Sequence, residues 1–205
     1  MEIRLETCRL RPWRMSDEHE LVFHANNRKV WRNMRDGFPH PYGELDAVNW
    51  LAKHIGVEPV RFFAIEREGQ LAGSIAVIPL EDVYRRSAEV GYFVAEPFWG
   101  KGIATEAVRG LTAYAFDTFP ELVRLHATVF AWNPASMRVL EKAGYEREAV
   151  LRQSIASAGC GASKGWAHAA IEKHQSGQPV RRAVLLDACA ALKLDPASLA
   201  AARIH

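Results

Sequence analysis

The sequence predicts one α/β domain over residues 1–155, followed by an atypical C-terminal segment over residues 156–205. Two observations carry this prediction. Residues 61–78 have the pattern of two strands joined by a Gly-containing turn. Residues 89–115 have the pattern of a strand, a glycine turn and an amphipathic helix. Because strand and helix patterns are interleaved along the chain, we expect helices packed on a sheet.

The N-terminal part should contain a strand, two helices and a connector. Residues 6–13 suggest a strand that ends at Pro12. Ser16 is a suitable N-cap for a helix over about residues 17–27. Residues 30–42 combine prolines with aromatic and charged residues, which is typical of a rigid connector rather than a core helix. A second helix is expected over residues 44–55, and its apolar face would hold Leu45, Val48, Leu51 and Ala52.

The predicted hairpin pairs residues 61–67 with residues 71–78 around the turn Glu68-Gly69-Gln70. Gly73 lies inside its second strand, where a glycine either weakens the strand or marks close approach of another backbone segment. Residues 89–95 then carry apolar side chains on both faces, which favours a central, buried strand.

A glycine turn joins this strand to the following helix. Gly100 and Gly102 permit backbone angles that other residues disfavour. The helix start offers N–H groups without intrahelical partners and the positive end of the helix dipole, so the turn is a candidate anion site. It matches neither the P-loop nor the dinucleotide fingerprint, and a purely structural turn is an equal alternative.

The next elements are a strand over residues 123–130 and a helix that begins at Asn133-Pro134, with Asn133 as N-cap and Gly144 as the residue after its end. His126 faces away from the apolar side chains of that strand, and a packed histidine is its more common role. Residues 145–152 should form a further strand. The composition then changes abruptly. Residues 180–191 and 196–203 look like short Ala-rich helices, either a genuine element or a tail read in a shifted frame.

The composition is that of an ordinary globular protein. Of the 205 residues 49% are hydrophobic and 24% charged, and the net charge of +2 predicts neither a general nucleic-acid surface nor a membrane surface. The three cysteines lack metal-site spacing and disulfide density, which favours the reducing cytoplasm. We expect no transmembrane helix and no signal peptide.

Two stretches carry a family resemblance: Phe98-Trp-Gly-Lys-Gly-Ile-Ala-Thr-Glu-Ala107, and downstream Asn133-Pro-Ala-Ser-Met-Arg-Val-Leu-Glu-Lys-Ala-Gly-Tyr145. Together they resemble the GNAT family of N-acetyltransferases, within it the branch of the ribosomal-protein alanine and serine N-acetyltransferases. The resemblance covers roughly residues 6–153. It implies a mixed, largely antiparallel sheet of six to seven strands flanked by about four helices. Family members usually add a seventh strand, for which residues 154–166 are a poor match.

The implied activity is direct transfer of an acetyl group from acetyl-CoA to a primary amine, either a protein N-terminus or a small molecule, without a metal. The resemblance assigns coenzyme binding to the fourth strand, the glycine turn and the later helix start: Phe93, Val94, Trp99, Gly100, Lys101, Gly102, Ile103, Ala104, Thr105 and Asn133. Trp99 departs from the usual Gln or Arg at its position. A solvent-facing Lys101 side chain is an equal alternative to a phosphate contact.

Glu89 is the predicted general base, because an ammonium must lose a proton before its nitrogen can attack a thioester. The resemblance implies that Ser136 protonates or hydrogen-bonds the departing thiolate. The connector would supply substrate contacts from Trp31, Asp36 and Tyr42. A strand-end ion pair for Glu89 and simple helix capping for Ser136 are the alternatives.

Two other functions fit the same turn. One is a catalytically inactive acyl-CoA-binding sensor or interaction module, and the other is a nucleotide-binding domain. The acceptor amine is the one partner that the resemblance implies, and both a monomer and a homodimer are compatible with the sequence.

Overall fold

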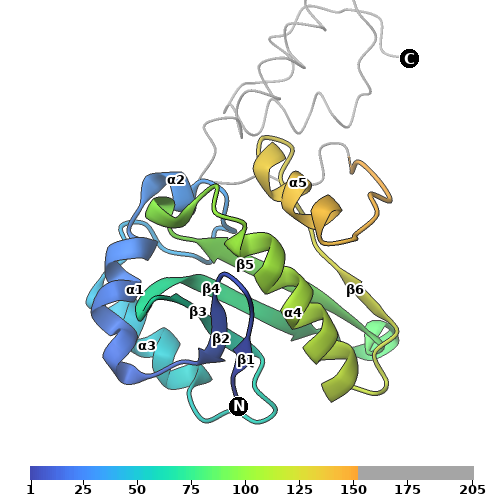
Figure 1. Ribbon diagram of the computed structural model, residues 1–205, viewed down its shortest axis with the longest axis horizontal. Coiled ribbons are helices and arrows are strands. Elements are labelled where there is room, and N and C mark those ends of the chain that lie inside the picture. The colour runs from blue at the N-terminus through green and yellow to red at the C-terminus, as the bar shows by residue number, and fades with distance from the viewer. Residues whose placement is uncertain (152–205) are drawn as a thin grey trace, which may run out of the picture. The chain divides into compact units, whose positions relative to one another are not determined.

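A six-stranded sheet lies at the centre of the residues that the computed structural model describes, residues 1–151. The strands lie side by side in chain order (Figure 1). They are β1 (Ile3–Arg4), β2 (Arg9–Pro12), β3 (Phe62–Arg67), β4 (Gln70–Pro79), β5 (Ser87–Val94) and β6 (Arg124–His126). Neighbours are antiparallel except β5 and β6, which are parallel. The predicted mixed, largely antiparallel sheet is confirmed.

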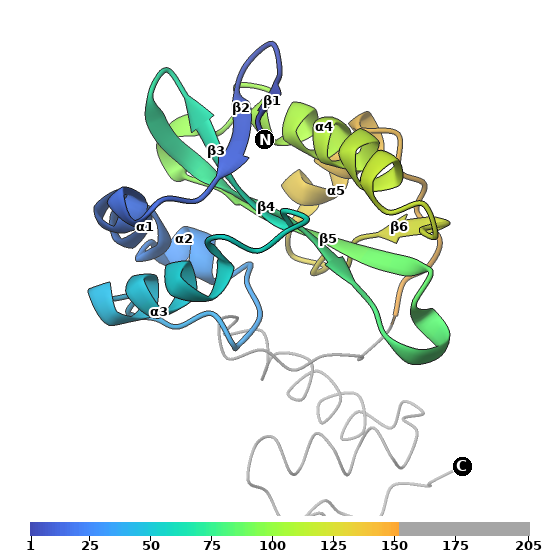
Figure 2. The same cartoon turned by 90° about the horizontal axis from the view of Figure 1, so that it is seen from below.

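Helices cover both faces of this sheet (Figure 2). One face packs on α4 (Ile103–Thr118) and α5 (Pro134–Lys142), the other on α1 (Glu18–Ala25), α2 (Arg28–Trp31) and α3 (Glu44–His54). Short 3-10 turns span Met15–Asp17, Asp82–Tyr84 and Glu96–Phe98. None of the helices within residues 1–151 has the length and apolar character needed to cross a membrane.

The β3–β4 hairpin forms as predicted. Glu68 and Gly69 both have positive φ angles, 53° and 80°, as a two-residue hairpin turn of type I′ requires. Gly73 marks a close backbone approach: a Cβ atom there would lie 2.2 Å from the carbonyl oxygen of Phe93. Gly73 therefore allows β5 to press closely against β4 at the end of β5 that leads to the glycine turn.

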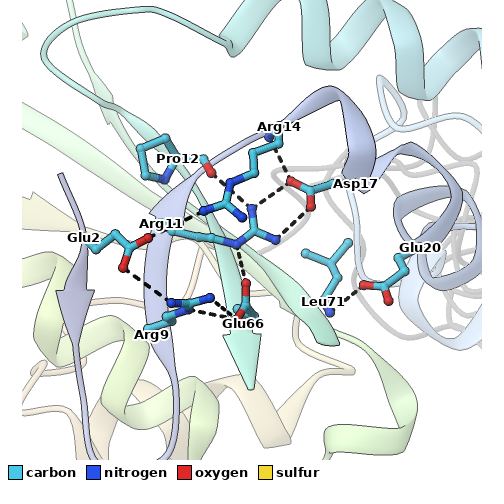
Figure 3. A network of polar contacts seen from close by, with 9 residues as sticks. All are labelled: Glu2, Arg9, Arg11, Pro12, Arg14, Asp17, Glu20, Glu66 and Leu71. Atoms are coloured by element: carbon cyan, nitrogen blue, oxygen red, sulfur yellow. Dashed lines mark hydrogen bonds and ion pairs between the residues drawn. The ribbon is translucent and has the colours of Figure 1, made fainter. Parts of the chain in front are cut away.

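A buried ion network fixes β2 to β3 and to the turn before α1 (Figure 3). Arg11 is only 4% exposed and donates hydrogen bonds to Glu66 at 2.5 Å and to Asp17 at 2.7 and 2.8 Å. Arg9 donates to the other oxygen of Glu66 at 2.8 Å. Burial by itself raises the pKa of Glu66, but the hydrogen bonds from Arg11 and Arg9 outweigh it, so the pKa lies below its ordinary value.

Three local predictions need correction. Ser16 does not cap α1, because a 3-10 turn over Met15–Asp17 precedes the helix and makes Asp17 the N-cap residue. Leu45 is 73% exposed, whereas Ala47 and Leu51 are fully buried, so the packed face of α3 is rotated from the predicted one. The connector begins with the short helix α2, which the sequence did not suggest.

The last part of the domain also differs from expectation. β6 spans three residues instead of eight, and residues 145–151 form no strand. Tyr145 is instead tied to α4 by a hydroxyl–hydroxyl hydrogen bond to Thr112 at 2.8 Å. Because β6 is so short, it offers little backbone edge for a following strand. The predicted boundary at residue 155 and the expected helices over residues 180–191 and 196–203 lie outside the described residues.

Candidate active site

A cavity of about 690 Å³ opens beside β5. Its walls come from α2 and the segment that follows it, from β5, from the glycine turn and the start of α4, and from residues 127–130 and α5. Every element that the sequence nominated for function therefore meets at one place. The volume is that of a small-molecule site.

One edge of β5 is open toward this cavity. Two hydrogen bonds show which residues of β5 bond to β4: one runs from Ala95 N to Ala72 O, the other from Leu80 N to Ser87 O. Odd-numbered residues of β5 therefore bond to β4, and the N–H and C=O groups of the even-numbered ones point to the opposite edge. β6 accompanies that edge only as far as the pair Glu89–His126. Beyond this pair, the backbone groups of Tyr92 and Val94 face the cavity side.

The indole of Trp99 already occupies one group of this edge. Its Nε1 donates to the carbonyl oxygen of Val94 at 2.6 Å, and the side chain is about half exposed at the cavity rim. A Gln or an Arg at this position would carry several N–H donors, whereas Trp has one. Here that single donor is used by the carbonyl oxygen of Val94.

The glycine turn has the geometry of an anion cradle. Gly100 and Gly102 have φ angles of 76° and 81°, which L-residues rarely adopt. Gly102 is the N-cap of the 16-residue helix α4 and has no side chain to satisfy the first N–H groups. A Cβ atom at either glycine would have no atom within 4 Å, so the space over the turn is open. A phosphate group fits these donors and the positive end of the helix dipole.

Glu89 lies at the base of the cavity, with its side chain 13% exposed. Its carboxylate accepts a hydrogen bond from the guanidinium of Arg35, a residue that the sequence analysis did not single out. Glu89 is thus both a cavity residue and half of an ion pair. His126, its neighbour on β6, does not line the cavity, and among the described residues its Nδ1 has no hydrogen-bond partner.

Two hydroxyl groups meet on the α5 side. Asn133 caps α5 through a hydrogen bond from Ser136 N to its Oδ1 at 3.1 Å, as predicted. The hydroxyl of Ser136 lies 2.8 Å from the hydroxyl of Tyr92 on β5. Burial raises the pKa of Tyr92, so its hydroxyl stays protonated near neutral pH. Either of the two hydroxyl groups can donate to the other. Tyr92 was not among the predicted site residues.

Of the three residues predicted to contact the acceptor, one lines the cavity and two do not. Tyr42 lines the cavity, is 4% exposed, and burial raises its pKa to about 12. Trp31 does not line it: its ring stacks on His40 and its Nε1 donates to the carbonyl of Phe38. Asp36 is exposed and also lies outside the lining. The geometry therefore supports a direct substrate contact only for Tyr42.

The predicted coenzyme residues all line the cavity, but Phe93 lies on the other side of β5 from the rest. Its side chain packs in the core that faces α1 and α3, with its ring 6.0 Å from that of Phe38. The cavity also contains basic side chains that the sequence analysis missed, namely Arg138 and Lys142 of α5. Alternation along β5 was the available signal for Phe93, since odd and even side chains must point to opposite faces.

Comparisons with known proteins identify relatives of this chain. A family model described as "Acetyltransferase (GNAT) domain" matches residues 8–146. The spermidine N(1)-acetyltransferase of Escherichia coli (strain K12) is 31% identical over 71% of this chain and 76% of its own length. The structure of spermidine N-acetyltransferase from Vibrio cholerae in complex with CoA and spermine superposes with a TM-score of 0.58, at 26% identity, over 71% of this chain and 84% of that one.

A third comparison concerns the fold alone. Mycobacterium smegmatis RimJ in complex with CoA-disulfide superposes with a TM-score of 0.66, at 23% identity, over 78% of this chain and 82% of that one.

Proposed function

Because the chain belongs to the acetyltransferase (GNAT) family, we propose that it transfers the acetyl group of acetyl-CoA directly to a primary amine. One observation carries the proposal: the glycine cradle, the open edge of β5 and the carboxylate of Glu89 all border the same cavity. The names of similar proteins describe a complex with CoA or acetylation of an amine, which supports the choice of donor and of reaction class.

The coenzyme would lie along the α4 and α5 side of β5. Its pyrophosphate would bind the turn at Gly100 and Gly102 and the first N–H groups of α4. Lys101, Arg138 and Lys142 also line the cavity and would complement the negative charge. The amide groups of the pantetheine arm would pair with the open backbone edge of β5, in the manner of an added strand.

The chemistry must remove two protons from the acceptor nitrogen and deliver one to the thiolate. Glu89 would take a proton from the acceptor ammonium, which frees the nitrogen lone pair. The nitrogen then attacks the thioester carbonyl carbon, the C–N bond forms, and the C–S bond breaks. A backbone N–H near Val94 would stabilise the negative charge that develops on the carbonyl oxygen. Ser136 would donate a proton to the thiolate that leaves and would regain one from the attacking nitrogen, which must lose its second proton to become the amide.

The test is release of free thiol from acetyl-CoA by the purified full-length chain, with a panel of peptides and small amines. Calorimetric binding of coenzyme A is measured beside it. Thiol release that depends on the amine supports the transferase. Coenzyme binding without release for any amine would favour the sensor. Absence of binding to correctly folded protein would contradict the placement of the coenzyme on the glycine turn.

A further inference from the structure

The acceptor side of the cavity has a floor with two different ends. Glu89, Gly91 and Phe93 all line the cavity and alternate along β5, so they project from one face of the sheet. With a rise of about 3.3 Å per residue, Glu89 and Phe93 are roughly 13 Å apart along the strand. Gly91 has no side chain between them. The floor is therefore charged at one end, bare in the middle and aromatic at the other end.

The segment after α2 faces this floor with a matching pattern. Arg35 binds Glu89 at the charged end. Phe38 packs at the aromatic end, with its ring 6.0 Å from that of Phe93 and 5.1 Å from that of Tyr42. Trp132, which follows the lining residues 127–130, also contacts this segment: its Nε1 donates to the carbonyl of Arg32 at 3.2 Å. The compartment thus has a cation and a carboxylate side by side, next to an apolar space.

The charges that line the cavity argue against a polyamine. Glu89 is the one carboxylate among the described residues of the lining, and Arg35 already binds it. Of the basic lining residues, Lys101, Arg138 and Lys142 are those assigned above to the coenzyme, and Lys29 pairs with Glu96, so Arg35 is the basic residue at the acceptor end. A polyamine that has lost one proton still carries further ammonium groups, and no second carboxylate among the described lining residues is left to pair with them. The spermidine enzymes among the similar proteins therefore do not predict the acceptor here.

We infer that the acceptor is a small amino-acid-like monoamine, with an anionic group next to the amine and an apolar or aromatic side chain. This inference rests on the proposed transferase function. An α-amino acid carries its amine and its carboxylate on one carbon. These two groups match the adjacent Glu89 and Arg35, which have the opposite charges. The amine would approach Glu89 and the carboxylate would bind Arg35, whose guanidinium has five N–H donors and uses one nitrogen for Glu89. The side chain would lie toward Phe38 and Phe93.

Four amines test this: L-phenylalanine, L-phenylalaninamide, 2-phenylethylamine and spermidine. The amide keeps the amine and the ring but lacks the negative charge. Thiol release should give a kcat/KM for phenylalanine at least about tenfold above that for its amide, as expected for a charge-assisted contact. Spermidine should be the poorest of the four. In Arg35→Met, the ratio of phenylalanine to its amide should fall to about one.

Arg32→Met is the matched control. Arg32 belongs to the same segment, is exposed and does not line the cavity, so this variant should keep the wild-type ratio. Arg35 has a side chain that is 68% exposed, so its replacement should leave the fold intact, which circular dichroism checks. Highest activity with spermidine, or an unchanged ratio in Arg35→Met, would overturn the acceptor class and leave the transferase standing. Thiol release with none of the four amines or the wider panel would overturn both.

Discussion

The hydroxyl pair between β5 and α5 offers a sharp test of how the thiolate leaves. Tyr92→Phe removes the hydroxyl that lies 2.8 Å from Ser136 Oγ but keeps the ring, which packs against the core under α4. A hydrogen bond between neutral groups contributes about 1 kcal/mol, which corresponds to about a fivefold change in rate. We therefore expect kcat to fall by about fivefold, with little change in the KM for acetyl-CoA.

Ser136→Ala should cost more, because Ser136 is the proposed donor to the charged thiolate. A hydrogen bond to a charged group contributes about 1.5–3 kcal/mol, or roughly 10–150-fold in kcat. If Tyr92 acts only by orienting the Ser136 hydroxyl, the double variant should be no slower than Ser136→Ala. Steady-state kinetics of the two single variants and the double variant, at saturating acetyl-CoA, measures this coupling.

The chain supplies its own control for this experiment. Tyr145 and Thr112 form a second hydroxyl pair, also at 2.8 Å, and neither residue lines the cavity. Tyr145→Phe should leave kcat unchanged. Since burial raises the pKa of Tyr92, the effect of Tyr92→Phe should also be constant from about pH 6 to pH 9. Independent, multiplying effects of Tyr92→Phe and Ser136→Ala would refute the orienting role.

Four further predictions concern the base, the cradle, the ion network and the sheet. Glu89→Gln should lower kcat by about 10²–10⁴-fold with unchanged coenzyme affinity; wild-type turnover at every pH would exclude Glu89 as the base. Gly102→Val should weaken calorimetric binding of coenzyme A by at least about tenfold, because the turn needs a φ of 81° and open space; unchanged affinity would contradict the cradle. Because the pKa of Glu66 is lower in the folded protein, its ion pairs add stability that is fully present above the ordinary pKa near 4.5 and is lost as the pH falls through the folded pKa. The urea midpoint of unfolding should therefore decline from about pH 5 to pH 3. In Glu66→Gln, this decline should be less steep. Gly73→Ala should lower the thermal midpoint by several degrees and raise the KM for both substrates, since its Cβ must displace Phe93; unchanged kinetics would show that β5 does not position both sites.

The sequence was most informative where one residue type has a single physical use. Gly100 and Gly102 were expected to take backbone angles that other residues avoid, and both have positive φ. Asn133 followed by proline predicted a helix start, and the cap is present. Gly69 predicted the hairpin turn. Each of these signals is local, so no knowledge of the tertiary fold was needed to interpret it.

The sequence could not predict pairs that the fold brings together. Arg35 and Glu89 are 54 residues apart, and Tyr92 and Ser136 are 44 apart. Nothing in the pattern around Arg35 distinguishes it from other surface arginines. The connector also shows the limit of composition: its aromatic residues suggested a pocket wall, but only the packing decides that Trp31 stacks on His40 instead of lining the cavity.

The alternation of β5 explains how one strand serves three parts of the site. Its odd-numbered side chains, Glu89 and Phe93, form the floor of the proposed acceptor compartment, while the side chain of Tyr92 points to the opposite face and contacts Ser136. Its even-numbered backbone groups form the open edge along which we place the coenzyme. A shift of one residue in the pairing with β4 would exchange all three roles at once. Gly73 opposes such a shift, because a Cβ atom at this position would lie only 2.2 Å from the carbonyl oxygen of Phe93, so a residue with a side chain does not fit there.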